Sequence, residues 1–194
     1  MKILPPELFC DCIILIHVQR EKQLEVFIIH NIPVYAVCGW SGSGKTTFIE
    51  GLIPELRKRG LRVAVVKHDA HDFSVDREGK DTFRFTQAGA EIVAITSGTH
   101  SAIMENRFTP LEDILTRIHD VDVIIAEGFK SHEGLKRIGI RRGNFELPDS
   151  EYIAVISDVP FECNVPVFDV NDYCTFAEWL VTDIRLPHIN YIML

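Results

Sequence analysis

Short, almost continuously apolar runs recur along the chain and alternate with amphipathic stretches. Runs of this kind that end at glycine or polar residues predict strands buried on both faces, as in parallel sheets. We expect such strands at residues 34–38, 61–67, 91–96, 121–126, 136–141, 152–157 and 165–170, with a further one at 101–105.

Helical periodicity fills several of the intervals. In residues 46–59 apolar side chains recur at helical spacing, and Gly60 ends the pattern. Residues 80–89, 109–119 and 172–183 predict further helices; in the second of these, Thr109 and Glu112 form a capping-box pattern around Pro110. The alternation indicates a three-layer α/β fold, with a mostly parallel sheet and helices on both faces. We expect a single domain over residues 34–184 to contain these strands and helices.

The two ends of the chain lie outside this pattern. Residues 8–18 and 24–37 are apolar runs broken by polar residues, and each is shorter than the ~20 residues of a membrane-spanning helix. No basic start and cleavage site mark a signal peptide. For residues 1–33 we expect an extra strand, a hairpin or a poorly ordered extension, and no membrane partner. Residues 185–194 form a tail without a clear pattern.

The charge and the cysteine content argue against some classes of partner and site. The net charge is −8 and the pI about 5.5, which argues against a nucleic-acid partner because such proteins need a basic face. The five cysteines are odd in number and follow no disulfide spacing, so we expect reduced thiols and a cytoplasmic location. We interpret Cys10 and Cys12 as buried small residues rather than half of a metal site, because no second ligand pair follows.

A phosphate-binding motif follows the run at 34–38. Residues 39–46 read Gly-Trp-Ser-Gly-Ser-Gly-Lys-Thr, which matches G-x-x-x-x-G-K-[ST] between a predicted strand and a predicted helix. The glycines let backbone amides converge on an anion at the helix N-terminus. Lys45 would contact the β- and γ-phosphates, and Thr46 would offer its hydroxyl to Mg²⁺. The sequence therefore predicts a P-loop NTPase.

A magnesium site of this kind also needs a carboxylate near the threonine. Asp122 opens the run at 121–126 and Glu127 closes it, so the two lie roughly 17 Å apart in a strand. Nucleotides bind at the carboxyl ends of parallel strands. Glu127 is therefore the expected partner of Thr46.

The polar segment after residues 61–67 should lie near the γ-phosphate. Asp72, Asp76 and Asp81 are candidates to orient water or contact Mg²⁺, and Lys80 is a candidate phosphate contact. Both His68 and His71 could bind a metal, but a third ligand is not evident, so we interpret them as polar loop residues. Candidate catalytic residues are then Lys45, Asp76 and Glu127, and candidate metal ligands are Thr46, Asp76 and Glu127.

Further segments identify a resemblance. The P-loop GWSGSGKTT at 39–47, KHDAHDFSVDREGKDT at 67–82, QAGA at 87–90, EGFK at 127–130 and IAVISDVP with VFDVND within 153–172 together resemble the molybdopterin-guanine dinucleotide biosynthesis protein B (MobB) family over residues 34–181. The resemblance implies a homodimer that binds GTP with Mg²⁺, hydrolyses it weakly, and assists a molybdopterin guanylyltransferase.

Some features depart from the expected pattern. Residues 1–33 have no counterpart in the family. Relatives with a second P-loop lysine would carry it at Trp40, so activation by that lysine is not expected. The guanine-reading Asn-Lys-x-Asp motif is missing; Asp158 could read guanine through its carboxylate, and rival candidates are Asp169, Asn171 and Asp172. The nucleotide-binding candidates are Gly39, Trp40, Ser41, Gly42, Ser43, Gly44, Lys45, Thr46, Thr47, Lys80 and Asp158.

Other functions stay open. A small-molecule kinase would use Arg137, Arg141 and Arg142 beside the flexible stretch at 143–150. A metallochaperone-type GTPase would use His68, His71 and a cysteine. A binding module without turnover is a further alternative. The sequence does not identify a general base for hydrolysis. Candidate arginine fingers are Arg77, Arg84, Arg141 and Arg142.

Overall fold

A parallel sheet forms the centre of the molecule. The computed structural model describes residues 28–29, 32–69, 73–143 and 145–185. The strand order is β3-β6-β2-β7-β8-β9, and every neighbouring pair along it is parallel. The strands are β2 (Ile32–Cys38), β3 (Val63–Lys67), β6 (Val123–Glu127), β7 (Lys136–Arg141), β8 (Ala154–Ser157) and β9 (Val167–Asp169).

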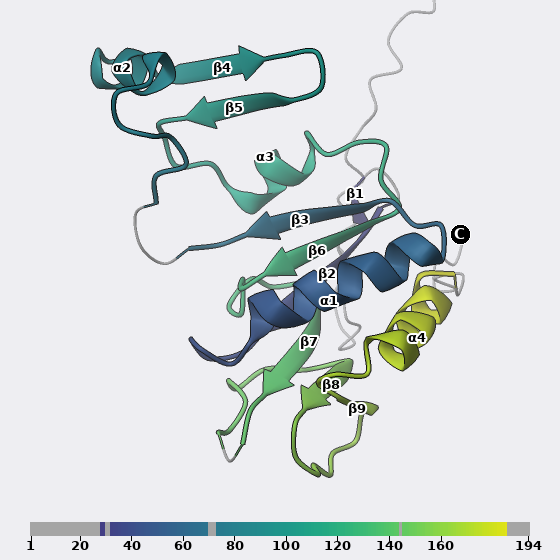
Figure 1. Ribbon diagram of the computed structural model, residues 1–194. Coiled ribbons are helices and arrows are strands. Elements are labelled where there is room, and N and C mark those ends of the chain that lie inside the picture. The colour runs from purple at the N-terminus through teal and green to yellow at the C-terminus, as the bar shows by residue number, and fades with distance from the viewer. Residues whose placement is uncertain (1–27, 30–31, 70–72, 144, 186–194) are drawn as a thin grey trace, which may run out of the picture.

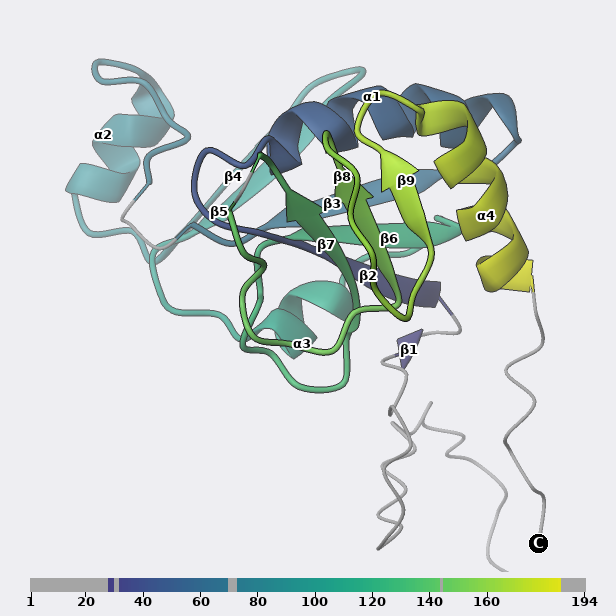
Figure 2. The ribbon, with the colours of Figure 1, turned by 90° about the horizontal axis from the view of Figure 1, so that it is seen from below.

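Helices cover both faces of this sheet. Helices α1 (Lys45–Lys58) and α4 (Tyr173–Arg185) lie on one face, and the short α3 (Leu111–Leu115) lies on the other (Figures 1 and 2). Strand β2 explains the arrangement, because Tyr35 and Val37 pack with α1 and α4 whereas alternate residues pack with α3. The predicted three-layer α/β fold is therefore confirmed.

A small unit projects beyond β3, the edge strand. It contains α2 (Asp81–Gln87) and an antiparallel hairpin of β4 (Ile92–Thr96) and β5 (Ser101–Glu105) (Figure 1). We expected both strands from the sequence but not their separation from the main sheet. The four-residue connection at 97–100 makes the two strands an antiparallel pair, because a parallel pair would need a crossover of a dozen residues or more.

Two local predictions change. The capping box at Thr109 is wrong: α3 begins at Leu111, its N-cap is Pro110, and no side chain caps it. The helix is also shorter than the predicted residues 109–119. It ends at Leu115 with Thr116 as its C-cap, and residues 116–117 form a turn.

The N-terminal extension contributes one described strand. Ile28–Ile29 forms β1, which pairs antiparallel with the start of β2. The sequence had left a strand, a hairpin and a poorly ordered extension open for residues 1–33. Residues 1–27, which include Cys10 and Cys12, and the tail at 186–194 lie outside the described residues. Within the described part of the chain, no helix is long and apolar enough to cross a membrane.

Candidate functional site

The loop between β2 and α1 is a tight turn with close backbone contacts. Ser43 N–H donates to Trp40 O at 3.2 Å, and Phe48 N–H donates to Gly44 O at 2.9 Å. A Cβ on Gly39 would lie 2.6 Å from Ser43 Oγ and 2.7 Å from Ile140 O. Only glycine fits at that position, so the residue is required by the turn itself.

The N-terminus of α1 has no internal anion or cap. Its N-cap is Gly44 at φ 87°, no side chain caps it, and its first turn has no acidic residue. Ser43 Oγ is buried without a hydrogen-bond partner. The first amides of a helix lack internal acceptors and carry partial positive charge. This end of α1 is thus suited to an external anion.

Lys45 adds a formal charge to the same loop. Its Nζ donates to Gly39 O at 3.1 Å and to Trp40 O at 2.9 Å. The ammonium group therefore folds back over the loop, where phosphate oxygens could replace the carbonyl oxygens as acceptors.

Thr46 and Glu127 meet at the carboxyl end of the sheet. Thr46 Oγ1 donates to Glu127 Oε1 at 2.8 Å, and the glutamate is buried. Lys67 Nζ lies 3.7 Å from the same oxygen, because Lys67 and Glu127 occupy one register position on neighbouring strands. We had not expected a role for Lys67 from the sequence, although its place at the end of β3 indicates that it lies near the P-loop.

Asp122 lies at the opposite end of β6 and has a different partner. Arg62 binds both of its oxygens, with Nη2–Oδ1 at 3.0 Å and Nε–Oδ2 at 3.1 Å. The hydrogen bonds from Arg62 lower the pKa of Asp122. This places Glu127, and not Asp122, beside the threonine, as expected from strand direction.

The segment after β3 makes its contacts elsewhere. Asp76 Oδ1 accepts the Arg77 N–H at 2.8 Å, and Lys80 is the N-cap of α2, which lies beside the hairpin (Figure 1). Neither residue bonds to residues 39–47 within the described chain. Asp81 is exposed and pairs with Arg84 at 3.7 Å. His71 and Asp72 lie outside the described residues.

A second loop, which follows β7 and is described at residues 142–143 and 145–147, is attached to the P-loop. Trp40 Nε1–H donates to Glu146 O at 2.8 Å, and Lys130 Nζ lies 4.8 Å from the centre of the Trp40 ring. On its other side, Gly143 N–H donates to Asp158 Oδ1 at 2.7 Å. Trp40 and Asp158, both predicted nucleotide-binding residues, thus hold this loop in place.

The rival candidates for base recognition have local partners. Asp169 Oδ1 accepts the Asn171 N–H at 2.8 Å. Asp172 Oδ1 accepts the Thr175 N–H at 3.1 Å, and hydrogen bonds from the side chain and the backbone of Thr175 lower the pKa of Asp172. Both carboxylates therefore shape the turn into α4. Asp158 is the one among these acids that contacts a loop bonded to the P-loop.

The described residues do not form the cluster of ligands that the metal-binding alternative needs. His68 packs against Phe129 with ring centres 5.1 Å apart and the rings tilted by 39°. Burial raises the pKa of the Cys38 thiol to about 11, so the thiol stays protonated at neutral pH and is a poor ligand. No group of three His, Cys, Asp or Glu residues suited to a metal ion occurs in the described ranges.

Comparison with known proteins adds the family. The family model described as MobB, molybdopterin guanine dinucleotide synthesis protein B, matches residues 34–158. The chain is 36% identical over 163 residues to the molybdopterin-guanine dinucleotide biosynthesis adapter protein of Haemophilus influenzae, covering 80% of this chain and 91% of that protein. Its identity to the protein of that name from Escherichia coli is 37% over 161 residues, covering 77% and 92%.

A solved structure agrees with these sequence matches. The crystal structure of Bacillus subtilis MobB matches with a TM-score of 0.65 at 25% identity, and the match covers 78% of this chain and 97% of that chain. The fold, the position of the P-loop and the sequence similarity thus all indicate the same family. The chain belongs to the MobB family of molybdopterin guanine dinucleotide synthesis proteins.

Proposed function

We propose that this protein is a GTP-binding adapter in molybdenum cofactor biosynthesis, where it assists the formation of molybdopterin guanine dinucleotide. The observation that carries the nucleotide part is the 2.8 Å bond between Thr46 and Glu127 beside the uncapped start of α1. The biosynthetic part is supported by the names of the relatives, which are adapter proteins for this dinucleotide. The cysteines in the described residues, Cys38, Cys163 and Cys174, are free thiols, which favours a reducing compartment such as the cytoplasm.

The phosphate chain would lie over residues 39–47. The loop amides and Lys45 would bind its oxygens, and Ser41, Ser43 and Thr47 would contribute hydroxyl groups. Thr46 and Glu127 would hold Mg²⁺, and the carboxylate of Glu127 would supply the negative charge that a hard cation requires. These residues fit the ion, because the hydroxyl and a buried carboxylate already converge.

The role of Asp76 and Lys80 depends on movement of the segment that follows β3. Asp76 Oδ2 is buried without a partner, so the carboxylate has an oxygen available for a cation or for water. We place Asp76 as a third magnesium ligand and Lys80 as a phosphate contact in the nucleotide-bound state. Turnover by this arrangement would be slow, because the described residues offer no evident general base near the loop.

Guanine recognition is assigned to Asp158. Its Oδ1 is bonded to Gly143, and Oδ2 would accept a hydrogen from the base. A carboxylate accepts hydrogens only, which suits the N1–H and 2-amino group of guanine and not adenine, whose N1 is an acceptor.

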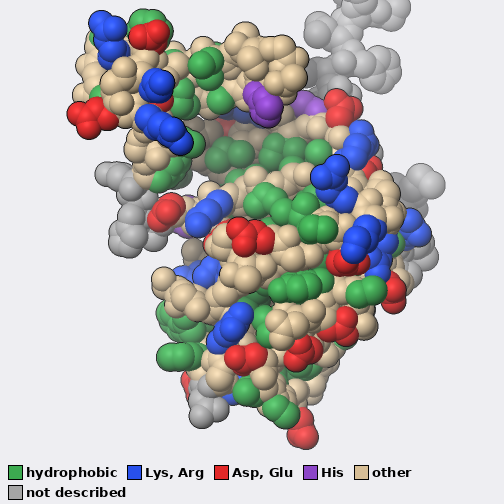
Figure 3. All heavy atoms as spheres, in the orientation of Figure 1, with side chains coloured by type: hydrophobic (Ala, Val, Ile, Leu, Met, Phe, Trp, Pro, Cys, Tyr) green, Lys and Arg blue, Asp and Glu red, His purple; other side chains and the backbone are tan. Residues whose placement is uncertain are grey.

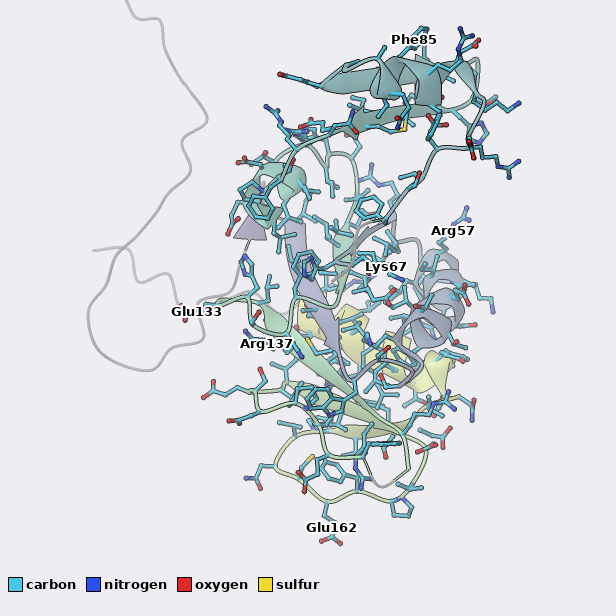
Figure 4. The ribbon with its side chains drawn as sticks, turned by 90° about the vertical axis from the view of Figure 1, so that its left-hand side faces the viewer. Arg57, Lys67, Phe85, Glu133, Arg137 and Glu162 are labelled. Atoms are coloured by element: carbon cyan, nitrogen blue, oxygen red, sulfur yellow. The ribbon has the colours of Figure 1, made fainter. Side chains whose placement is uncertain are left out.

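The projecting unit supports a homodimer. Phe85, Ile92, Ile95, Ile103 and Phe108 are exposed hydrophobic side chains on or beside it, and Figure 4 shows Phe85 at its outer side. A two-stranded sheet is marginally stable alone, and apolar patches of this kind mark interfaces. We place the second copy of the chain on this hairpin, and the guanylyltransferase partner elsewhere.

The face covered by α1 and α4 does not favour a nucleic-acid partner. Figure 3 shows acidic and basic side chains interspersed there, without a continuous basic surface. Such binding needs clustered Lys and Arg.

Nucleotide titration tests the proposal. The full chain should bind labelled GTP more tightly with Mg²⁺ than with EDTA, and ATP should displace it poorly. Lys45→Ala should weaken GTP binding by about tenfold or more, since it removes a charge-assisted contact. Equal displacement by ATP would remove the guanine assignment, and a phosphoryl acceptor consumed with the nucleotide would instead indicate a kinase. Wild-type protein that does not bind nucleotide would refute the proposal.

A further inference from the structure

Arg142 lies directly against the N-cap of α1. A Cβ placed on Gly44 would lie 3.0 Å from Nη2 and 3.1 Å from Nε of Arg142. Those two atoms form the edge of a guanidinium that binds two oxygens side by side. The edge therefore faces the backbone of the residue at which the P-loop enters its helix.

This guanidinium has no protein anion to balance it. Within the described residues Arg142 forms no ion pair or side-chain hydrogen bond, whereas carboxylates pair with Arg59, Arg62, Arg84, Arg107 and Arg117. Lys45, which follows Gly44 in the chain, adds a positive charge to the start of α1, and this end of a helix repels cations. The carboxylate of Asp158 bonds to the backbone N–H of Gly143 and not to the guanidinium. A cation at this position is favourable only when an anion joins it.

The loop that carries Arg142 is held from both sides. Trp40 bonds to Glu146 O, and Asp158 bonds to Gly143 N. Arg141, the preceding residue, stacks over Phe161 with its guanidinium 4.7 Å from the ring centre, so the two arginines have separate surroundings. The backbone that carries Arg142 is thus held in place without a ligand, which reduces the entropy lost on binding.

We propose that Arg142, the first residue after β7, is a direct ligand of the nucleotide's phosphate chain and is supplied by the same chain. This inference rests on the proposed function and assigns a residue outside the P-loop motif to it. Trp40 and Asp158 are then positioning residues, because they act on the phosphates through the placement of the loop that carries Arg142.

The test compares GTP affinity and thermal unfolding of full-length variants. Arg142→Ala should lower GTP affinity by about tenfold, and Arg142→Lys by less, since lysine keeps the charge and loses the planar fork. The control is Arg57→Ala, which removes an exposed arginine in the last turn of the same helix (Figure 4). It should bind GTP as the wild type does.

Thermal unfolding separates ligand binding from a structural role. Without nucleotide, Arg142→Ala should leave the Tm unchanged or raise it, because it removes a cation from the positive helix end; the rise in Tm caused by GTP should shrink. Wild-type GTP affinity in Arg142→Ala, or a Tm lowered equally with and without GTP, would overturn the inference alone. A wild-type chain without GTP affinity would remove the proposed function as well.

A double-mutant cycle tests the positioning role of Trp40. Trp40→Phe removes the indole N–H and keeps an aromatic ring, so it should weaken GTP binding less than Arg142→Ala does. In the Arg142→Ala background the same change should have no further effect. Additive losses would show that Trp40 acts independently of Arg142.

Discussion

The hydroxyl of Tyr35 donates a 2.6 Å hydrogen bond to Oδ2 of Asp183, although 148 residues separate them. Lys136 Nζ contacts the same carboxylate oxygen at 2.7 Å. The three side chains join β2, β7 and α4 at the end of the sheet opposite the P-loop, which fixes α4 to the strand that precedes the loop.

Removal of the Asp183 carboxylate should destabilise the protein. Asp183→Ala leaves the buried Lys136 ammonium and the Tyr35 hydroxyl without their partner, which should cost about 2–3 kcal/mol. Chemical denaturation measures this loss. The control is Glu178→Gln on the same helix, whose side chain is exposed and pairs with Arg59; it should cost under about 1 kcal/mol. Equal losses in both variants would contradict the assigned role of the cluster.

The same cluster predicts a decline in stability at alkaline pH. Burial raises the pKa of Tyr35, and the bond to Asp183 and its charge raise it further. The folded state therefore holds this proton more tightly than the unfolded state, so its contribution is complete below the ordinary tyrosine pKa of ~10 and is lost as the pH rises above it. Tyr35→Phe should make the alkaline decline less steep. Tyr152, whose pKa burial raises to about 12, should keep part of the slope.

Glu127 should control the magnesium dependence of GTP binding. Glu127→Gln removes the negative charge beside Thr46, so Mg²⁺ should no longer increase GTP affinity. Titrations with Mg²⁺ and with EDTA measure the effect. Asp122→Asn is the matched control, since Asp122 lies on the same strand and pairs with Arg62 at its other end; its magnesium dependence should equal that of the wild type. A full magnesium effect in Glu127→Gln would exclude Glu127 from the metal site.

Substitutions at Asp158 should separate base recognition from loop anchoring. Asp158→Asn keeps an oxygen that can accept the Gly143 N–H, but its amide cannot accept two hydrogens from guanine. Preference for GTP over ATP should fall by about tenfold while the Tm stays unchanged. Asp158→Ala should also loosen the loop. If Asp158→Asn retains the wild-type preference, the carboxylate serves only as an anchor.

A charge on the hairpin should disrupt the proposed dimer. Ile103 is exposed on β5, and Ile103→Lys would place an unpaired charge in an apolar interface. Analytical ultracentrifugation should show a dimer for the wild type and a monomer for the variant. Ile103→Val is the control, because it keeps the surface apolar. A monomeric wild type would remove the dimer from the proposal.

Local pattern was enough to predict much of this protein. The apolar runs predicted each parallel strand of the main sheet within about two residues, because a buried strand needs apolar side chains on both faces. The P-loop motif predicted the turn before α1, since the glycines and the following lysine and threonine have backbone and charge requirements that are met within a few residues. Strand direction alone separated Glu127 from Asp122.

Other features depend on contacts between distant parts of the chain. Three features came only from the tertiary structure. They are the separation of β4 and β5 from the main sheet, the position of Arg142 against Gly44, and the bond of Trp40 to Glu146. The sequence named several arginines without a means to choose among them. Periodicity reports which side of an element is buried, but not which distant loop lies against it. Residues 39–47 were thus determined by local sequence, and the loop that holds Arg142 over them was decided by the order in which the strands assemble.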